Sequence, residues 1–134
     1  MEDESLIVPG IPVVVSGPSG VGKGSIIAAV LKRRQEISLS VSMTSRAPRP
    51  GERDGVDYVF VDRPTLLRHI EEGALLEWAE VYGEIYGTPR EPVARNLEAG
   101  RDVIMEIDVQ GGLSVRKHYP SACLVFILPP SRED

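Results

Sequence analysis

The chain has 134 residues, of which 42% are apolar and 26% charged, and its formal net charge is −5 at pH 7. This length and composition are typical of one soluble globular domain with a modest core. The acidic balance argues against nucleic-acid binding, no apolar run approaches the roughly 18 residues that span a membrane, and the acidic N-terminus is no signal peptide. The single cysteine, Cys123, lies in an apolar run, which predicts a core residue of a cytoplasmic protein.

A glycine-rich segment between two apolar runs is the strongest local signal in the chain. After a flexible leader at residues 1–10, residues 11–15 predict a buried strand and residues 23–34 an apolar helix. Strand, glycine-rich turn, lysine and helix together indicate a phosphate-binding loop, because glycines let backbone N–H groups converge on a phosphate at the positive end of a helix. The predicted ATP phosphate-binding residues are Gly17, Pro18, Ser19, Gly20, Val21, Gly22, Lys23, Gly24 and Ser25.

Lys23 supplies the mobile positive charge of this loop, which suits the β- and γ-phosphates of a nucleotide and makes it a candidate catalytic residue. The motif usually has Ser or Thr directly after the lysine, where the hydroxyl meets Mg²⁺, whereas this chain has Gly24 there and Ser25 next. We therefore expect any metal contact of Ser25 to run through water.

The segment after this helix predicts short, mixed elements. Residues 37–41 indicate a second strand and residues 42–55 a loop, because two prolines and two glycines there disfavour regular structure. Residues 56–61 alternate as a half-buried strand. A helix that Asp62 caps and Gly73 ends should have a buried side formed by Leu66, Leu67, Ile70 and Leu75.

The rest of the chain alternates strands and helices. The predicted elements are a strand at residues 75–82, a turn at 83–88, a helix at 89–99, a strand at 102–108, a helix at 110–118 and a strand at 122–128. Strands that alternate with helices at both ends of the chain indicate an α/β fold with a parallel sheet covered on both faces. We assign residues 11–41 and 92–134 to this core and residues 42–91 to a small mixed lobe.

Several motifs resemble one family, in the same order along the chain. Residues 40–52, Ser-Val-Ser-Met-Thr-Ser-Arg-Ala-Pro-Arg-Pro-Gly-Glu, followed by Gly-Val-Asp-Tyr at 55–58, resemble the GMP-binding lobe of guanylate kinases. Leu-Glu-Trp-Ala at 76–79, Tyr-Gly-Thr at 86–88 and Glu-Ile-Asp-Val-Gln-Gly at 106–111 match the same family. The resemblance starts at the first predicted strand, and it implies a P-loop core with an inserted α+β lobe that phosphorylates GMP to GDP with ATP and Mg²⁺.

The resemblance implies that the GMP phosphate is bound by Arg46, Arg49, Tyr58 and Tyr86, with Arg46 also catalytic. Guanidinium forks and phenolic hydroxyls suit a tetrahedral dianion. Taken alone, the two arginines would be solvated loop charges, but the prolines that stiffen their loop and the tyrosine downstream favour binding. No general base is required, because the second pKa of a phosphate monoester is about 6 and GMP is already mostly a dianion at neutral pH.

The same resemblance implies that Ser42, Glu77 and Thr88 read the guanine base, with Gly87 in the same motif. A carboxylate only accepts hydrogen bonds, and guanine offers N1–H and 2-amino donors on one edge, whereas adenine offers a lone pair at N1. The alternative for Glu77 is that it is a solvated carboxylate on a strand. We expect its neighbour Trp78 to serve packing.

Two acidic residues close the strand at 102–108. By the resemblance, Asp108 lies near bound GMP and Glu106 near the hydration shell of the metal. Guanylate kinases continue with a lid that carries arginines and with a last strand and helix, so we expect this chain to lack them and to transfer phosphate weakly. The alternative function is a catalytically inactive nucleotide-binding remnant or a guanylate-kinase-like interaction module. We also expect residues 122–128 to form an open apolar edge through which two copies associate.

Overall fold

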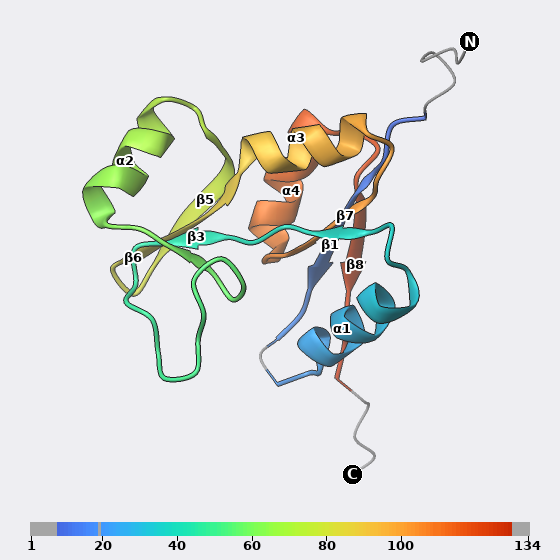
Figure 1. Ribbon diagram of the computed structural model, residues 1–134, viewed down its shortest axis with the longest axis horizontal. Helices are drawn as coiled ribbons and strands as arrows, with labels where there is room; N and C mark the ends of the chain where they lie inside the picture. The colour runs from blue at the N-terminus through green and yellow to red at the C-terminus, as the bar shows by residue number, and fades with distance from the viewer. Residues whose placement is uncertain (1–7, 19, 130–134) are drawn as a thin grey trace. The chain divides into compact units, whose positions relative to one another are not determined.

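The computed structural model describes residues 8–18 and 20–129, which fall into two compact units, each with its own sheet (Figure 1). The first unit comprises the described parts of Met1–Leu39 and Asn96–Asp134, and the second comprises Ser40–Arg95. The lobe predicted at residues 42–91 falls within the second unit. Along the described residues, no helix is long and apolar enough to cross a membrane.

The first unit contains a parallel four-stranded sheet in the order β2-β7-β1-β8. This is the parallel arrangement that the alternation of strands and helices predicts. Strand β1 lies between β7 and β8, so β8 forms one edge of the sheet as far as the described residues show. The elements are β1 (Pro12–Ser16), α1 (Lys23–Arg33), β2 (Ser38–Leu39), β7 (Val103–Glu106), α4 (Val109–His118) and β8 (Cys123–Phe126), with α3 (Arg90–Glu98) leading in from the second unit.

Alternate side chains of β1 divide the core of the first unit between two helices. Val14 faces α4, where a Cβ added to Gly112 would lie 3.0 Å from the Val14 side chain. Val15 faces the other way and forms a cluster with Ile27 of α1 and Ile104 of β7. The first sheet therefore has a helix on each face, as the sequence predicts.

The second unit contains a mixed sheet in the order β4-β3-β6-β5, in which β3 runs parallel to β4 and antiparallel to β6. Helix α2 begins at Asp62, whose carboxylate accepts a 2.8 Å hydrogen bond from the N–H of Thr65. Its Leu66 is fully buried against Leu75 and Ile85. The elements are β3 (Met43–Thr44), β4 (Val59–Phe60), α2 (Arg63–Glu71), β5 (Leu75–Val81) and β6 (Glu84–Pro89).

The turn predicted at residues 83–88 is wrong, because β6 occupies this segment and pairs with β5. The turn is confined to Tyr82 and Gly83, which have φ values of 51° and 81°. Gly87 indicated a turn, but its missing side chain serves close packing. A Cβ there would lie 2.7 Å from the Leu75 side chain and 3.2 Å from the Glu77 carbonyl oxygen.

Two other predictions for the second unit need correction. The loop predicted at residues 42–55 contains β3, which forms because β6 and β4 both offer it a pairing partner. The strand predicted at residues 56–61 is only Val59–Phe60. Its first residues instead form a turn, in which the Asp57 N–H donates to the Arg53 carbonyl at 3.0 Å.

Three side chains predicted to be buried are exposed. Leu67 is 46% and Trp78 51% exposed, so neither serves the core as predicted. Cys123 is exposed because β8 lies at the edge of the described sheet rather than inside it. A strand made only of apolar residues therefore does not identify a central strand here.

Candidate functional site

The glycine-rich segment connects β1 to α1 in the first unit, as predicted. Gly22 caps α1 with a left-handed backbone, φ 95°, and as a glycine it has no side chain that could bond to the start of the helix. The first turn of α1 also carries no acidic residue, so the positive end of the helix is left for an anion. Gly17 is held close to β8, since a Cβ there would lie 2.6 Å from the Ile127 carbonyl oxygen. Ser19 lies outside the described residues.

Lys23 folds back over this loop. Its Nζ donates a 2.5 Å hydrogen bond to the carbonyl oxygen of Gly17, and the contact is partly buried. An ammonium group has three donors, so this bond tethers the charge beside the loop while two N–H groups remain for phosphate oxygens. The loop thus combines a helix N-terminus that has no acidic residue in its first turn with a tethered cation.

A cavity of about 440 Å³ opens beside the loop at the carboxyl ends of β1, β7 and β8. Ligands of open parallel sheets bind at this end of the strands. Ser16 is fixed at the rim by a 2.6 Å hydrogen bond from its Oγ to the Ile107 carbonyl. The lining residues are Ser16, Gly17, Pro18, Asp108, Val109, Phe126, Leu128 and Pro129.

The acidic residues predicted at the end of β7 differ in their contacts. Asp108 caps α4 by accepting a 2.7 Å hydrogen bond from the Gly111 N–H, so its carboxylate has a structural role in the first unit. Glu106 is exposed, and so is Ser25 in the first turn of α1. Among the described residues no group of three acidic, histidine or cysteine side chains could hold a metal by itself. A divalent cation beside Ser25 and Glu106 would therefore take most of its ligands from other sources, such as water.

One face of the second sheet carries the polar side chains predicted for the second ligand. Tyr86 and Thr88 are two residues apart on β6, so both point to the face opposite α2. Thr44 pairs with Tyr86 and Glu77 pairs with Thr88 across the neighbouring strands, which places their side chains on this same face. Phe60 joins them because it pairs with Thr44.

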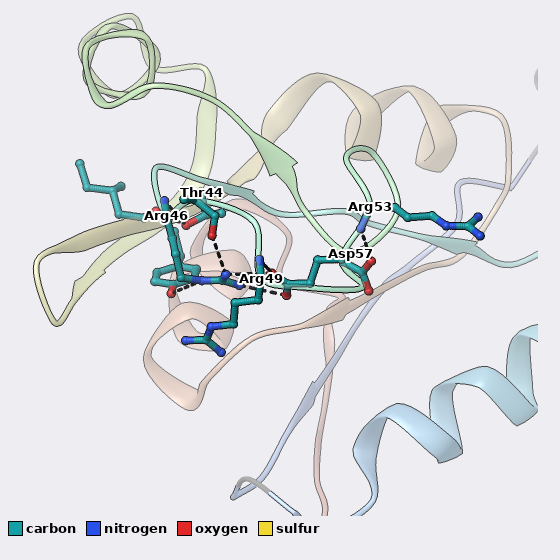
Figure 2. Close-up of polar contacts among 9 residues, drawn as sticks. Thr44, Arg46, Arg49, Arg53 and Asp57 are labelled. Carbon is teal, nitrogen blue, oxygen red and sulfur yellow. Dashed lines mark hydrogen bonds and ion pairs between the residues drawn. The ribbon is translucent and has the colours of Figure 1, made fainter.

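The Arg46 guanidinium lies at one end of this face, where several groups hold it in place (Figure 2). Its Nε donates to Tyr86 Oη at 3.3 Å and its Nη1 to the Ala47 carbonyl at 2.9 Å. The Glu52 carboxylate accepts from Nη1 at 2.8 Å and from Nη2 at 3.1 Å. The ring centroid of Tyr58 lies 5.2 Å from Arg46 Cζ, within cation–π range.

This ion pair shifts the ionisation of both partners. Hydrogen bonds from Arg46, followed by the N–H of Arg49, lower the pKa of Glu52 from 4.5 to about 2. The bond to Glu52 raises the pKa of Arg46 further above its ordinary value. Both groups therefore stay charged at neutral pH.

Arg49 differs from Arg46 in that its side chain is exposed. Its backbone N–H donates to the Glu52 carboxylate at 2.7 Å, and Figure 2 shows its guanidinium extending away from the marked contacts. The loop thus holds one fixed guanidinium and exposes another.

At the other end of the face, Thr88 Oγ1 donates to the Glu77 carboxylate at 2.7 Å. Thr88 is fully buried, whereas Glu77 is partly exposed, so the carboxylate is fixed by the hydroxyl yet reaches the surface. Ser42 precedes β3 and is partly buried, and its carbonyl accepts a 2.9 Å hydrogen bond from the Val59 N–H.

The structure brings Arg46, Tyr58 and Tyr86 together and joins Glu77 to Thr88, while Lys23 and Asp108 belong to the first unit. Sequence reasoning missed Glu52, which joins Arg46, Tyr58 and Tyr86 in what we call the arginine cluster. Its position six residues after Arg46, just beyond a Pro-Gly turn, is the only signal that could have indicated the pair.

A sequence model of the family described as Guanylate kinase matches residues 10–134 of the chain. The chain belongs to the guanylate kinase family. Guanylate kinases from Caldanaerobacter subterraneus subsp. tengcongensis and Thermobifida fusca are 50% and 54% identical to it over 93% and 90% of its length. The crystal structure of guanylate kinase from Anaplasma phagocytophilum has a TM-score of 0.80 and 38% identity over 92% of the chain.

These guanylate kinases are longer than the chain. It covers 61% and 62% of the two curated relatives and 63% of the crystallised guanylate kinase. The similarity to the crystallised guanylate kinase and the parallel sheet of the first unit confirm the α/β fold that the sequence predicts.

Proposed function

We propose that this protein transfers the γ-phosphoryl group of ATP to GMP and releases ADP and GDP. The observation that supports this most is the pair of polar clusters on one face of the second sheet, Arg46 with Tyr86 and Glu77 with Thr88. Tyr86 and Thr88 are two strand residues apart, a distance of roughly 7 Å. One nucleotide can therefore engage both clusters, with its phosphate at the arginine and its base at the carboxylate.

At the phosphate end, each group contributes a donor. Arg46 Nε already donates to Tyr86 Oη, so the tyrosine oxygen acts as acceptor there and its own proton is available for a phosphate oxygen. Tyr58 adds a second phenolic hydroxyl beside the same guanidinium. The exposed Arg49 supplies a further positive charge that can follow the dianion.

At the base end, Glu77 gives selectivity for guanine. Its carboxylate accepts from the N1–H and 2-amino groups of guanine, while adenine would bring an unpaired lone pair against it. The 2.7 Å bond from Thr88 holds the carboxylate in place before the base arrives. Ser42 and Gly87 belong to this end of the proposed site by their positions in the sequence.

The phosphate loop is proposed to bind ATP. The α1 N-terminus, which has no acidic residue in its first turn, and Lys23 would stabilise the negative charge of the β- and γ-phosphates. Mg²⁺ would neutralise phosphate charge, with Ser25 and Glu106 contacting its bound water. Catalysis is then positioning and charge neutralisation, because GMP is already mostly a dianion at neutral pH. A cytoplasmic location is part of the proposal, in line with the free Cys123.

A coupled assay of ADP formation tests this function. The chain is incubated with ATP and Mg²⁺, and with GMP, AMP or neither, beside the same chain in which Lys23 is replaced by Met. ADP formation that depends on GMP and on Lys23 supports the proposal. Binding of both nucleotides without transfer favours the nucleotide-binding alternative, and failure to bind GMP contradicts the proposal.

A further inference from the structure

We propose that Glu52 is a positioning residue, which fixes the Arg46 guanidinium for the phosphate of the second nucleotide. This inference rests on the proposed function, since it assigns a role to a side chain beside the proposed phosphate end. Glu52 contacts no substrate in this account and acts only through Arg46.

The first support is the number of donors that meet on one carboxylate. Glu52 accepts from both terminal nitrogens of Arg46, at 2.8 and 3.1 Å, and from the backbone N–H of Arg49 at 2.7 Å. The Arg46 and Glu52 side chains are only 13% and 20% exposed. By comparison, the partners of the Arg63–Glu80 pair in the same unit are 47% and 51% exposed. The Glu52 contact therefore fixes both the plane of one arginine and the backbone of the other.

The second support comes from the N–H groups of Arg46. A guanidinium has five N–H donors. Two go to Glu52, one to the Ala47 carbonyl and one to Tyr86 Oη, which leaves one on Nη2. A phosphate can accept that donor without breaking the ion pair. Glu52 thus determines which direction the remaining N–H faces.

The third support is the charge of the loop. Residues 46–52 contain two arginines and one glutamate, so their net charge is +2 − 1 = +1. Because Glu52 neutralises Arg46, the uncompensated charge is that of the exposed Arg49. Arg46 then provides a hydrogen-bond donor of fixed direction, and Arg49 provides the net positive charge that attracts the phosphate.

Removing the Glu52 charge has two opposite effects on anion binding. Loss of a negative group attracts the phosphate more strongly, whereas a loosened Arg46 binds it less well. Glu52→Asp isolates the positioning effect, since aspartate keeps the negative charge but is too short to meet both terminal nitrogens of Arg46. High salt also isolates the positioning effect, because at about 1 M the Debye length is only about 3 Å and the long-range attraction of the phosphate is screened.

The test measures the dissociation constants of GMP and guanosine by calorimetry at low salt and at about 1 M salt. Their ratio reports the contribution of the phosphate. For Glu52→Asp and Glu52→Gln at high salt, we expect GMP to bind about tenfold more weakly, as for one misaligned hydrogen bond to a charged group, and guanosine to bind as before. The control Glu80→Gln breaks the exposed ion pair with Arg63 and should leave both constants unchanged.

A double-mutant cycle shows whether Glu52 acts through Arg46. In an Arg46→Ala background, Glu52→Asp should cause no further loss of GMP affinity. An equal loss in both backgrounds overturns the positioning role, as does unchanged GMP affinity of Glu52→Asp at both salt concentrations. If the unmodified chain binds GMP no more tightly than guanosine, the proposed function itself fails at this site. Unfolding midpoints of all variants identify any loss that comes from misfolding.

Discussion

Thr88 donates a 2.7 Å hydrogen bond to the Glu77 carboxylate from the position that pairs with Glu77 across β5 and β6. The donor is fully buried and the acceptor is partly exposed. This contact links the sheet register to the proposed recognition of the base, because a slip of one residue would move either side chain to the opposite face.

Replacing Glu77 by Gln should weaken GMP binding by about 2–3 kcal/mol, since an amide presents one mismatched donor to the base in place of a charged acceptor. AMP binding should be unchanged or stronger, and Glu80→Gln on the same strand serves as the control. Calorimetric titration of both nucleotides measures the difference. Equal losses for GMP and AMP would show that Glu77 supports the strand and does not read the base.

Replacing Lys23 by Met should weaken ATP binding at the phosphate loop by at least about tenfold, because a hydrogen bond to a charged group contributes about 1.5–3 kcal/mol. The control is Lys32→Met, an exposed lysine in the last turn of the same helix. Crystals of the unmodified chain grown from sulfate should hold an anion on the amides of residues 20–24. If the loop binds no anion and Lys23→Met leaves the ATP affinity unchanged, the proposed ATP site is contradicted.

The arginine cluster should make stability depend on pH in the acid range. The folded pKa of Glu52 is about 2, below its ordinary value of 4.5, so the stabilisation by its charge is complete above about pH 4.5. It is lost as the pH falls toward 2, when the folded protein also binds the proton. Urea unfolding should therefore show a difference between the unmodified chain and Glu52→Gln that is full at neutral pH and shrinks toward pH 2. A difference that stays constant with pH would contradict the ion pair.

The fold of the first unit follows from local sequence patterns. Its glycine-rich loop lies between a run of β-branched residues and an apolar helix, and each signal involves residues that are close in the chain. Cys123 is exposed, contrary to the prediction, because burial of β8 depends on which strands flank it, and β8 lies at the edge of the described sheet. Sequence alone gives the strand but not its place in the sheet.

The second unit was harder to predict because its contacts join distant residues. Strand β3 has only two residues, and its pairing with β6 brings together Thr44 and Tyr86. Gly87 predicts a turn by its residue type, but the close approach of Leu75 explains its presence in β6. The family resemblance predicts Arg46, Tyr58 and Tyr86 together. No spacing rule predicts that both carboxylate oxygens of Glu52 accept hydrogen bonds from Arg46.

The edge that β8 forms in the described sheet should promote self-association. Val125 and Phe126 are 40% and 52% exposed on this strand, and the edge carries no charge that would prevent pairing. Val125→Lys should lower the average mass measured by light scattering at high protein concentration, whereas Leu113→Lys, at a similarly exposed apolar residue of α4, should not. If the unmodified chain is a monomer at every concentration, β8 is not an association edge.

The most direct test of the proposed function is a calorimetric titration of the chain with GMP and AMP under identical conditions. Because Glu77 and Thr88 should favour guanine, we expect GMP to bind at least about a hundredfold more tightly than AMP, the discrimination expected when a hydrogen-bonding site loses its matching partner. Equal affinities for the two nucleotides would contradict it, because the face of the second sheet would then not distinguish the bases.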